Sequence, residues 1–214
     1  MTPPSPQPAS PRGAGAKPII GIAGGIGSGK SFVADLFGEL GCRVIKSDQQ
    51  VYRAYQREDV KAQLRAWWGD RAFTPAGEVD RRAVAAIVFD SPPERVRLEG
   101  LIHPLVNAER RQLMLQEAGN PAIRAFVWDT PLLFETGLNR ECDCIVFVDA
   151  PLEVRLRRVS ARGWTADDLT ARENLQLPLD KKRRISDYCV SNIDGIDVVR
   201  EQVRDVLARI LARV

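Results

Sequence analysis

The eight residues from Gly24 to Ser31 read Gly-Gly-Ile-Gly-Ser-Gly-Lys-Ser and match every position of the phosphate-loop pattern G-x-x-x-x-G-K-[ST]. Glycines allow the backbone of such a loop to curl, so that successive N–H groups and the N-terminus of the next helix point at phosphate oxygens. Lys30 adds a positive charge, and the Ser31 hydroxyl is an oxygen ligand suited to magnesium. The motif predicts a binding site for a nucleoside triphosphate.

The flanking residues supply the elements that such a loop needs. The apolar run from Ile19 to Ala23 precedes the loop directly and predicts a buried strand. After Lys30, apolar residues recur at helical spacing until Gly41, which is placed to end the helix in a left-handed cap. The segment therefore predicts a strand, a loop and a helix in the order that a phosphate loop requires.

Four further apolar runs predict strands, and helical patterns separate them. These runs are Arg43 to Ile45, Ile123 to Trp128, Cys144 to Val148 and Tyr188 to Val190. Alternation of strands and helices favours a parallel sheet with helices on both faces. We therefore expect an α/β fold of the P-loop, three-layer type with five parallel strands and a last helix from Val198 to Val214.

Two segments are too long to be simple crossovers. Residues 49–120 predict an inserted helical subdomain that binds an acceptor. Its expected helices are Val51 to Trp68, Asp80 to Val88 and Pro93 to Glu117. Residues 151–185 predict an arginine-rich lid, with a break at Gly163 and Trp164 and a new helix capped by Thr165 and Asp168.

The chain is thus expected to form a single P-loop domain over residues 18–214. Its core would comprise residues 18–48, 121–150 and 186–214, while residues 1–17, which are rich in Pro, Ala and Ser, predict a disordered tail. A net charge of +3, from 31 basic and 28 acidic residues, gives no field that favours nucleic acid or an acidic membrane. Four cysteines without a C-x-x-C pair predict a cytoplasmic protein, and no stretch is apolar enough to span a membrane. We expect a monomer or a weak homo-oligomer.

Acidic residues follow three of the predicted strands, at the edge of the sheet where ligands bind in open α/β folds. Asp48 follows the strand expected to lie beside the phosphate-loop strand; it would accept a hydroxyl proton, hold magnesium through water, or cap the next helix. Asp129 is either a magnesium-binding acid or a turn residue before Pro131, and Asp149 is interpreted as a cap of the helix that follows. His103, before Pro104, is interpreted as a turn residue rather than a catalyst.

Taken together, these stretches resemble the dephospho-coenzyme A kinase family of P-loop kinases from Pro18 to Val203. The resemblance rests on the phosphate loop Gly21 to Ser31, the His-Pro segment Glu99 to Val106 and the stretch Asp129 to Glu135. Further on, the same residue types as in the lid and closing region of that family stand at Arg158, Arg162, Arg172, Gln176, Lys182, Arg183, Asp187 and Asn192.

This resemblance implies transfer of the γ-phosphoryl of ATP to the ribose 3′-hydroxyl of dephospho-coenzyme A, with Mg²⁺. The catalytic residues it implies are Asp48, Lys30 and Arg162. The ATP-binding residues it implies are Gly25, Ile26, Gly27, Ser28, Gly29, Lys30, Ser31, Phe32, Arg158 and Asn192. It implies that acceptor binding involves Asp48, His103, Asp129 and Leu132, and that Ser31 holds the metal.

Two departures from the family pattern bear on activity. The usual Asp-Ala-Asp is replaced by Lys46-Ser47-Asp48, so one acid is lost; on an extended strand Lys46 and Asp48 would share one face. Phe32 stands where the family generally has Thr, which should affect packing more than chemistry. The alternatives are another small-molecule or nucleotide kinase on this scaffold, and a catalytically impaired ATP-binding regulatory homologue.

Overall fold

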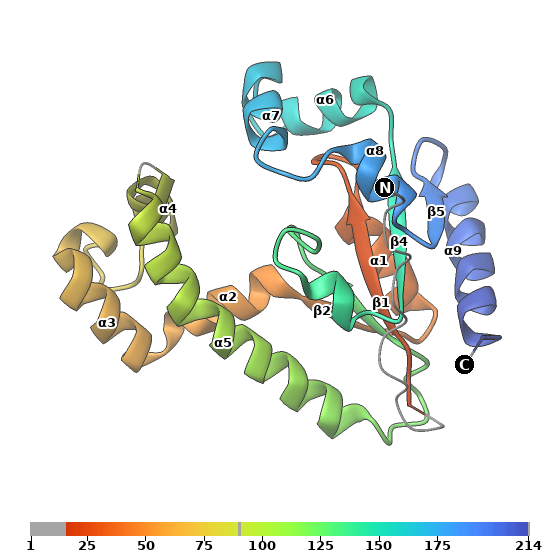
Figure 1. Ribbon diagram of the computed structural model, residues 1–214, viewed down its shortest axis with the longest axis horizontal. Coiled ribbons are helices and arrows are strands. Elements are labelled where there is room, and N and C mark those ends of the chain that lie inside the picture. Colours follow the sequence, from red (N-terminus) through yellow and green to blue (C-terminus); the bar gives the residue numbers. More distant parts are fainter. Residues whose placement is uncertain (1–15, 90, 214) are drawn as a thin grey trace, which may run out of the picture. The chain divides into compact units, whose positions relative to one another are not determined.

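The computed structural model describes residues 16–89 and 91–213, so the first 15 residues of the predicted tail 1–17 lie outside the described part of the chain. Five strands form one parallel sheet in the order β2-β3-β1-β4-β5 (Figure 1). The strands are β1 (Ile19–Gly24), β2 (Arg43–Lys46), β3 (Phe126–Asp129), β4 (Cys144–Asp149) and β5 (Tyr188–Ser191). The predicted α/β fold with five parallel strands is confirmed.

Burial explains the order of the strands. All residues of β1 and β3 are buried, whereas the edge strands β2 and β5 expose Arg43 and Cys189. The prediction that β2 lies beside β1 is wrong, because β3 lies between them. All residues of β3 are buried, which suits an inner strand of a sheet that is covered on both faces. Asp129 at the carboxyl end of β3 therefore lies next to the strand that enters the phosphate loop, in register with Ile22.

The strand predicted from Ile123 begins three residues later, at Phe126. The reason is a turn that precedes the strand, in which the Ile123 N–H donates to the carbonyl oxygen of Asn120 at 3.1 Å. The chain therefore enters the sheet only after this turn has closed.

Helices α1 (Lys30–Glu39) and α9 (Ile196–Leu211) share one hydrophobic core with strands of the sheet. Helix α1 ends as predicted at Gly41, which has a left-handed φ of 86°. The Gly41 N–H donates to the Gly38 carbonyl at 3.0 Å, and the Cys42 N–H donates to the Phe37 carbonyl at 3.1 Å. These are the paired bonds of a Schellman motif, which satisfy the last carbonyls of the helix.

The other face of the sheet is covered closely by the segment after β3. A Cβ atom added to Gly21 of β1 would lie 2.8 Å from both the Sγ atom of Cys142 and a methyl group of Leu133. This segment contains the short helix η2 (Leu138–Glu141). Glycine at position 21 is therefore required by packing rather than by backbone conformation.

The predicted lid contains three helices: α6 (Leu152–Ser160), α7 (Ala166–Glu173) and α8 (Leu179–Arg184). The predicted break is confirmed at Gly163, where φ is 82°. The predicted cap is also confirmed, since the Asp168 N–H donates to Thr165 Oγ1 at 3.1 Å and the Thr165 N–H donates to Asp168 Oδ2 at 2.9 Å. None of the described helices has the length and apolar character that crossing a lipid bilayer requires.

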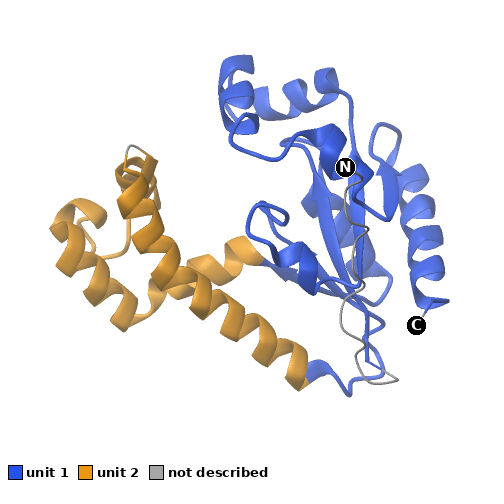
Figure 2. Ribbon diagram, viewed as in Figure 1, with its two compact units in different colours: residues 1–46, 117–214 blue, residues 47–116 orange. Residues whose placement is uncertain are grey.

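Two compact units divide the chain: residues 1–46 with 117–214, and residues 47–116 (Figure 2). The second unit contains α2 (Ser47–Gln56), α3 (Glu58–Trp68), η1 (Gly69–Ala72) and α4 (Arg81–Phe89), and α5 (Pro92–Glu117) runs to its end. It has a hydrophobic core of its own, formed by Ala54, Tyr55, Val60, Leu64, Trp68, Ala72, Val84, Ile102 and Val106.

The single helix predicted from Val51 to Trp68 is wrong, because the chain breaks at Arg57. Arg57 is extended, with φ −71° and ψ 135°, and its guanidinium pairs with Asp59 at 2.7 Å. Glu58 and Asp59 then occupy the first turn of α3, where acidic side chains favour the start of a new helix.

Candidate active site

The phosphate loop joins β1 to α1 with three glycines in backbone conformations that other residues rarely adopt. The φ angles are 148° at Gly24, 77° at Gly27 and 92° at Gly29. A Cβ atom would also collide with its surroundings, since it would lie 2.6 Å from the Val148 carbonyl oxygen at Gly24 and 2.2 Å from the Asn192 side-chain nitrogen at Gly29. The loop therefore requires glycine for both conformation and space.

Two arginines of α6 hold the carbonyl groups of the loop. Arg155 donates to the Ile26 carbonyl oxygen at 3.3 Å, and Arg158 donates to those of Gly27 at 3.3 Å and Ser28 at 2.9 Å. In a planar trans peptide the N–H of the next residue points the opposite way from the carbonyl. The three carbonyls are thus turned toward α6, and the amides that follow them are turned away from it.

Asn192, immediately after β5, completes this arrangement. Its side-chain amide is buried and donates to the Ser28 carbonyl oxygen at 2.7 Å. Its backbone N–H donates to the carbonyl of Asp149 at 2.8 Å, and its backbone carbonyl accepts from Arg158 at 2.9 Å. The closing region of the sheet therefore supports the phosphate loop directly.

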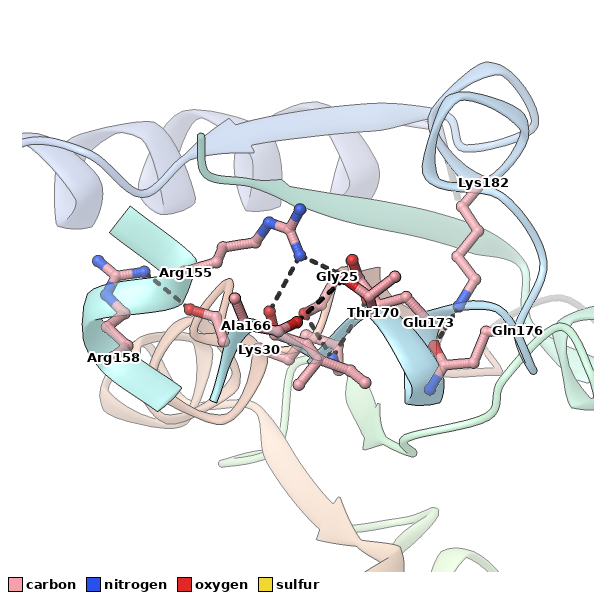
Figure 3. Close-up of polar contacts among 12 residues, drawn as sticks. Gly25, Lys30, Arg155, Arg158, Ala166, Thr170, Glu173, Gln176 and Lys182 are labelled. Atoms are coloured by element: carbon pink, nitrogen blue, oxygen red, sulfur yellow. Dashed lines mark hydrogen bonds and ion pairs between the residues drawn. The ribbon is translucent and has the colours of Figure 1, made fainter. Parts of the chain in front are cut away.

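Lys30 begins α1 and turns back over the loop, where its ammonium donates to the carbonyl oxygens of Gly24 at 3.2 Å and Gly25 at 3.1 Å (Figure 3). Burial, with a smaller contribution from the nearby Lys182, lowers the pKa of Lys30 to about 8, although Asp129, Glu135 and Glu173 act in the opposite direction. A bound phosphate would stabilise the charged form. Lys30 is therefore placed where it would bind an anionic ligand favourably.

Ser31 and Phe32 follow Lys30 in the first turn of α1, and both are exposed. Asp129 ends β3 and is buried, and Leu132 is exposed a few residues later. Because the carboxyl ends of β1 and β3 meet at one edge of the sheet, Asp129 and the loop belong to the same site. The influence of Asp129 on the pKa of Lys30 agrees with this placement.

A buried ion pair that the sequence reasoning did not assign to the site joins the lid to the segment after β3. Lys182 lies 2.9 Å from Glu135. It also donates to Gln176 at 2.9 Å (Figure 3). The Leu177 N–H donates to Glu135 at 2.9 Å. Burial opposes ionisation of Glu135, but its bonds with Lys182 and Leu177 hold its pKa below the usual range.

Two predicted lid residues lie at the surface. Arg162 is exposed in the turn after α6, and its guanidinium forms no ion pair with any residue that the structure describes. Arg172 of α7 stacks over the ring of Trp164, with 4.2 Å between its central carbon and the ring centroid. Of these two cations, Arg162 has no ion-pair partner among the described residues, and Arg172 is in contact with an aromatic ring.

Asp149 does not cap the next helix, which corrects the prediction from the sequence. Helix α6 has Pro151 at its N-cap position and no side-chain capping bond. The Asp149 carboxylate instead lies 3.0 Å from Arg183 of α8. Arg183 gives the Asp149 carboxylate a charged partner, and such a bond is stronger than a capping bond to a neutral N–H.

Asp48 and His103 belong to the unit of residues 47–116. Asp48 is exposed in the first turn of α2, which begins at Ser47, so Asp48 is neither an N-cap nor a strand residue. The expectation that Lys46 and Asp48 share one strand face is therefore wrong. His103 is exposed inside α5 rather than in a turn, and Pro104 is accommodated within the same helix.

Arg155 and Glu135 are the site residues that sequence reasoning missed as individuals. Glu135 had a signal, because it is a charged residue at the end of the apolar stretch Leu132 to Phe134. Arg155 had none, because it is one of several arginines in a basic run and only the structure shows it buried against the loop.

Comparison with known proteins identifies a family. A family model described as Dephospho-CoA kinase matches residues 18–197. A Dephospho-CoA kinase from Rhodopseudomonas palustris is 38% identical over 190 residues, which cover 88% of this chain and 94% of the relative. Another from Corynebacterium glutamicum is 36% identical over 197 residues, which cover 91% of this chain and 98% of the relative.

Solved structures share the fold of this chain. A crystal structure of a protein from Thermus thermophilus is similar with a TM-score of 0.76 and 35% identity, and covers 91% of this chain and 98% of its own. A dephospho-CoA kinase from Campylobacter jejuni, at a TM-score of 0.61 and 20% identity, covers 91% of this chain and 97% of its own and shows the same fold. Since the family model and these relatives span nearly the whole chain, the chain belongs to the dephospho-CoA kinase family.

Proposed function

We propose that the protein carries out the reaction of its family, in which the γ-phosphoryl group of ATP is transferred to the ribose 3′-hydroxyl of dephospho-coenzyme A to give coenzyme A. The observation that carries this proposal is the orientation of the loop. The Ile26 and Ser28 carbonyls are held by Arg155, Arg158 and Asn192, so the Gly27 and Gly29 amides that follow them are turned away from α6 for a polyphosphate before any ligand arrives. The Ser28 N–H between them donates to the Gly25 carbonyl at 3.2 Å.

The donor site fits a triphosphate in two further respects. Ser28 Oγ is buried and has no hydrogen-bond partner among the described residues, so a donor is available within the loop. The Lys30 ammonium donates to two carbonyl oxygens of the loop, and a phosphate would be a stronger partner. Residues Gly25 to Phe32, with Arg158 and Asn192, form the proposed ATP site.

Magnesium fits the same site through Ser31. Its hydroxyl is a hard oxygen donor in the first turn of α1, and Mg²⁺ commonly combines one or two protein oxygens with substrate phosphates and water. When bound, the ion would neutralise charge on the phosphates. Lys30 would hold the same phosphates in line for attack.

The remaining roles complete the proposed mechanism. Asp48 would accept the proton of the acceptor hydroxyl, and Arg162 would stabilise the transferring group, an effect that reaches about 10³ to 10⁵ in rate for such arginines. The exposed, unpaired guanidinium of Arg162 and the exposed carboxylate of Asp48 support these roles. His103, Asp129 and Leu132 would contact the acceptor.

A coupled assay of ATP consumption, with product identified by mass, tests the function. Purified protein and magnesium are supplied with dephospho-coenzyme A, AMP or adenosine. Formation of coenzyme A that depends on dephospho-coenzyme A supports the proposal. Phosphorylation of AMP or adenosine instead would make the protein a different small-molecule kinase, and ATP binding without any transfer would favour a regulatory homologue.

The cellular setting is also a proposal. The free thiols Cys42, Cys142, Cys144 and Cys189 are consistent with a reducing cytoplasm.

The proposed oligomeric state is a monomer or a weak homo-oligomer. Chromatography with light scattering at several concentrations distinguishes the two. Dissociation on dilution would identify the weak oligomer.

A further inference from the structure

A buried ion pair joins two helices of the lid. Arg155 of α6 lies 2.5 Å from Glu173, the last residue of α7, and only 7% of the Arg155 side chain and 23% of the Glu173 side chain are exposed (Figure 3). Burying two charges costs more free energy than filling the same space with apolar side chains. The pair therefore calls for an explanation other than stability.

The same arginine contacts the phosphate loop. Its Nη1 atom, which binds Glu173, also donates to the Ile26 carbonyl oxygen at 3.3 Å. A Cβ atom added to Gly25 would lie 3.1 Å from this nitrogen, so the guanidinium lies directly against the loop backbone. One buried side chain thus links α6, α7 and the loop.

This contact determines the orientation of one peptide group. When the Ile26 carbonyl is held toward α6, the N–H of Gly27 in the same peptide plane points the other way. Gly27 has a left-handed φ of 77°, and glycine has no side chain to limit its rotation, so the peptide needs an external support. Arg155 provides that support, and Glu173 holds the guanidinium in place.

We propose that Arg155 is a positioning residue for the donor nucleotide: anchored by Glu173, it fixes the Ile26–Gly27 peptide so that the Gly27 N–H faces the phosphates. Arg155 itself does not touch the nucleotide in this role. The identity of the nucleotide as ATP rests on the proposed function. The pair also makes the geometry of the loop depend on α7, so that the lid and the donor site are coupled.

The test compares Arg155→Met, Arg155→Lys and Glu173→Gln with the wild type. A hydrogen bond to a charged group is of the size that changes affinity about tenfold, so Arg155→Met should raise KM for ATP about tenfold. Glu173→Gln should raise it about fivefold, since the guanidinium remains but loses its anchor. Arg155→Lys should fall between wild type and Arg155→Met, because an ammonium keeps the charge but lacks the planar guanidinium geometry that lets Nη1 bind Glu173 and the Ile26 carbonyl together.

Matched controls lie on the same helix. Arg157 and Glu153 are exposed residues of α6, so Arg157→Met and Glu153→Gln repeat the chemical changes away from the loop. Both controls should keep KM for ATP within about twofold of wild type, as expected for exposed positions. The KM for dephospho-coenzyme A should also change less than about twofold in every variant, because the pair acts on the donor side.

Calorimetric titration with a non-hydrolysable ATP analogue measures donor binding without any acceptor. This readout separates the two proposals, since it remains valid if the wild type fails to phosphorylate dephospho-coenzyme A. A weaker Kd in Glu173→Gln with an unchanged far-UV spectrum supports the positioning role. A lower Tm with an unchanged Kd would show a purely structural pair and overturn it.

A double-mutant cycle gives an independent test. If Glu173 acts only through Arg155, then Arg155→Met combined with Glu173→Gln should weaken binding no more than Arg155→Met alone. Effects that simply add would contradict the proposal. Should Arg155→Met fail to fold, the cycle is built with Arg155→Lys, which preserves the buried charge.

Discussion

The Lys46 ammonium lies 2.6 Å from the carboxylate of Asp35, and this ion pair connects the end of β2 to α1. Asp35 is one helical turn beyond Ser31, and Lys46 is in register with Asp129 of β3. The residue that departs from the family pattern thus already has a partner of opposite charge. Its presence does not by itself argue for a catalytically impaired protein.

Replacement of Lys46 should therefore have a small effect on turnover. The pair is partly exposed, with 29% of the Lys46 side chain and 55% of the Asp35 side chain accessible, and such pairs contribute about 0 to 1 kcal/mol. Lys46→Ala should keep kcat within about threefold of wild type in the coupled assay. Loss of kcat by more than about tenfold would instead place Lys46 in the reaction.

The charge on Lys46 can be tested separately from its size. Lys46→Asp brings two carboxylates together and should lower the free energy of unfolding in urea by about 1 kcal/mol. The exchange Lys46→Asp with Asp35→Lys restores opposite charges and should recover most of that loss. If the double variant is no more stable than Lys46→Asp, the ion pair does not contribute to stability.

Lys30→Ala should abolish phosphoryl transfer without unfolding the protein. The ammonium is held by carbonyl oxygens of the loop, and burial lowers its pKa, so its removal takes away a charge that costs free energy in the absence of a ligand. Tm without ATP should stay equal or rise, while the increase in Tm on adding ATP is lost. Lys181→Ala, at an exposed position of α8, serves as the control and should retain both activity and the ATP-dependent increase.

Local patterns in the sequence were sufficient for the features that depend on neighbours in the chain. The strand before the loop, the helix stop at Gly41 and the cap at Thr165 were all predicted, because a few adjacent residues determine each of them. The break at Arg57 was missed although it is local, since apolar residues on both sides continue the helical spacing.

Features that depend on distant contacts could not be predicted in the same way. The place of β3 between β2 and β1 follows from which strand is buried on both faces. Lys182 and Glu135 are 47 positions apart, as their numbers show, and Arg155 is one arginine among several until its burial is known. Periodicity and spacing cannot predict such pairs, because these patterns describe one helix or strand at a time.

Gly29→Ala should remove ATP binding through a collision as well as backbone strain. Its φ is 92°, and the new Cβ would lie 2.2 Å from the Asn192 side-chain nitrogen that holds the Ser28 carbonyl. Gly137→Ala is a matched control, because Gly137 also has a positive φ of 74° but open space around it. The control should cost about 1 to 2 kcal/mol of stability and leave Kd for ATP unchanged.

Combining Gly29→Ala with Asn192→Ala separates the two effects. The double variant has no collision, because the Asn192 side-chain nitrogen is gone. The strain at position 29 remains, and the Ser28 carbonyl lacks its bond from Asn192. Its stability should therefore exceed that of Gly29→Ala, with ATP binding still weak. Equal stability of the two variants would mean that the Asn192 side chain moves aside at no cost.

Glu135→Gln should destabilise the protein at neutral pH by about 2 kcal/mol, because a buried ammonium on Lys182 then lacks its charged partner. The pKa of Glu135 is lowered in the folded state, so the stabilising contribution is present above the pKa of about 4.3 in the unfolded chain and is lost as pH falls through the folded value. The stability difference between wild type and variant should therefore shrink as pH falls below about 4. Urea unfolding of wild type and Glu135→Gln at pH 7 and pH 3 measures this difference. Glu99→Gln, at an exposed position of α5, is the control. A difference that persists undiminished at pH 3 would show that the Glu135 side chain stabilises the lid through packing rather than through its charge.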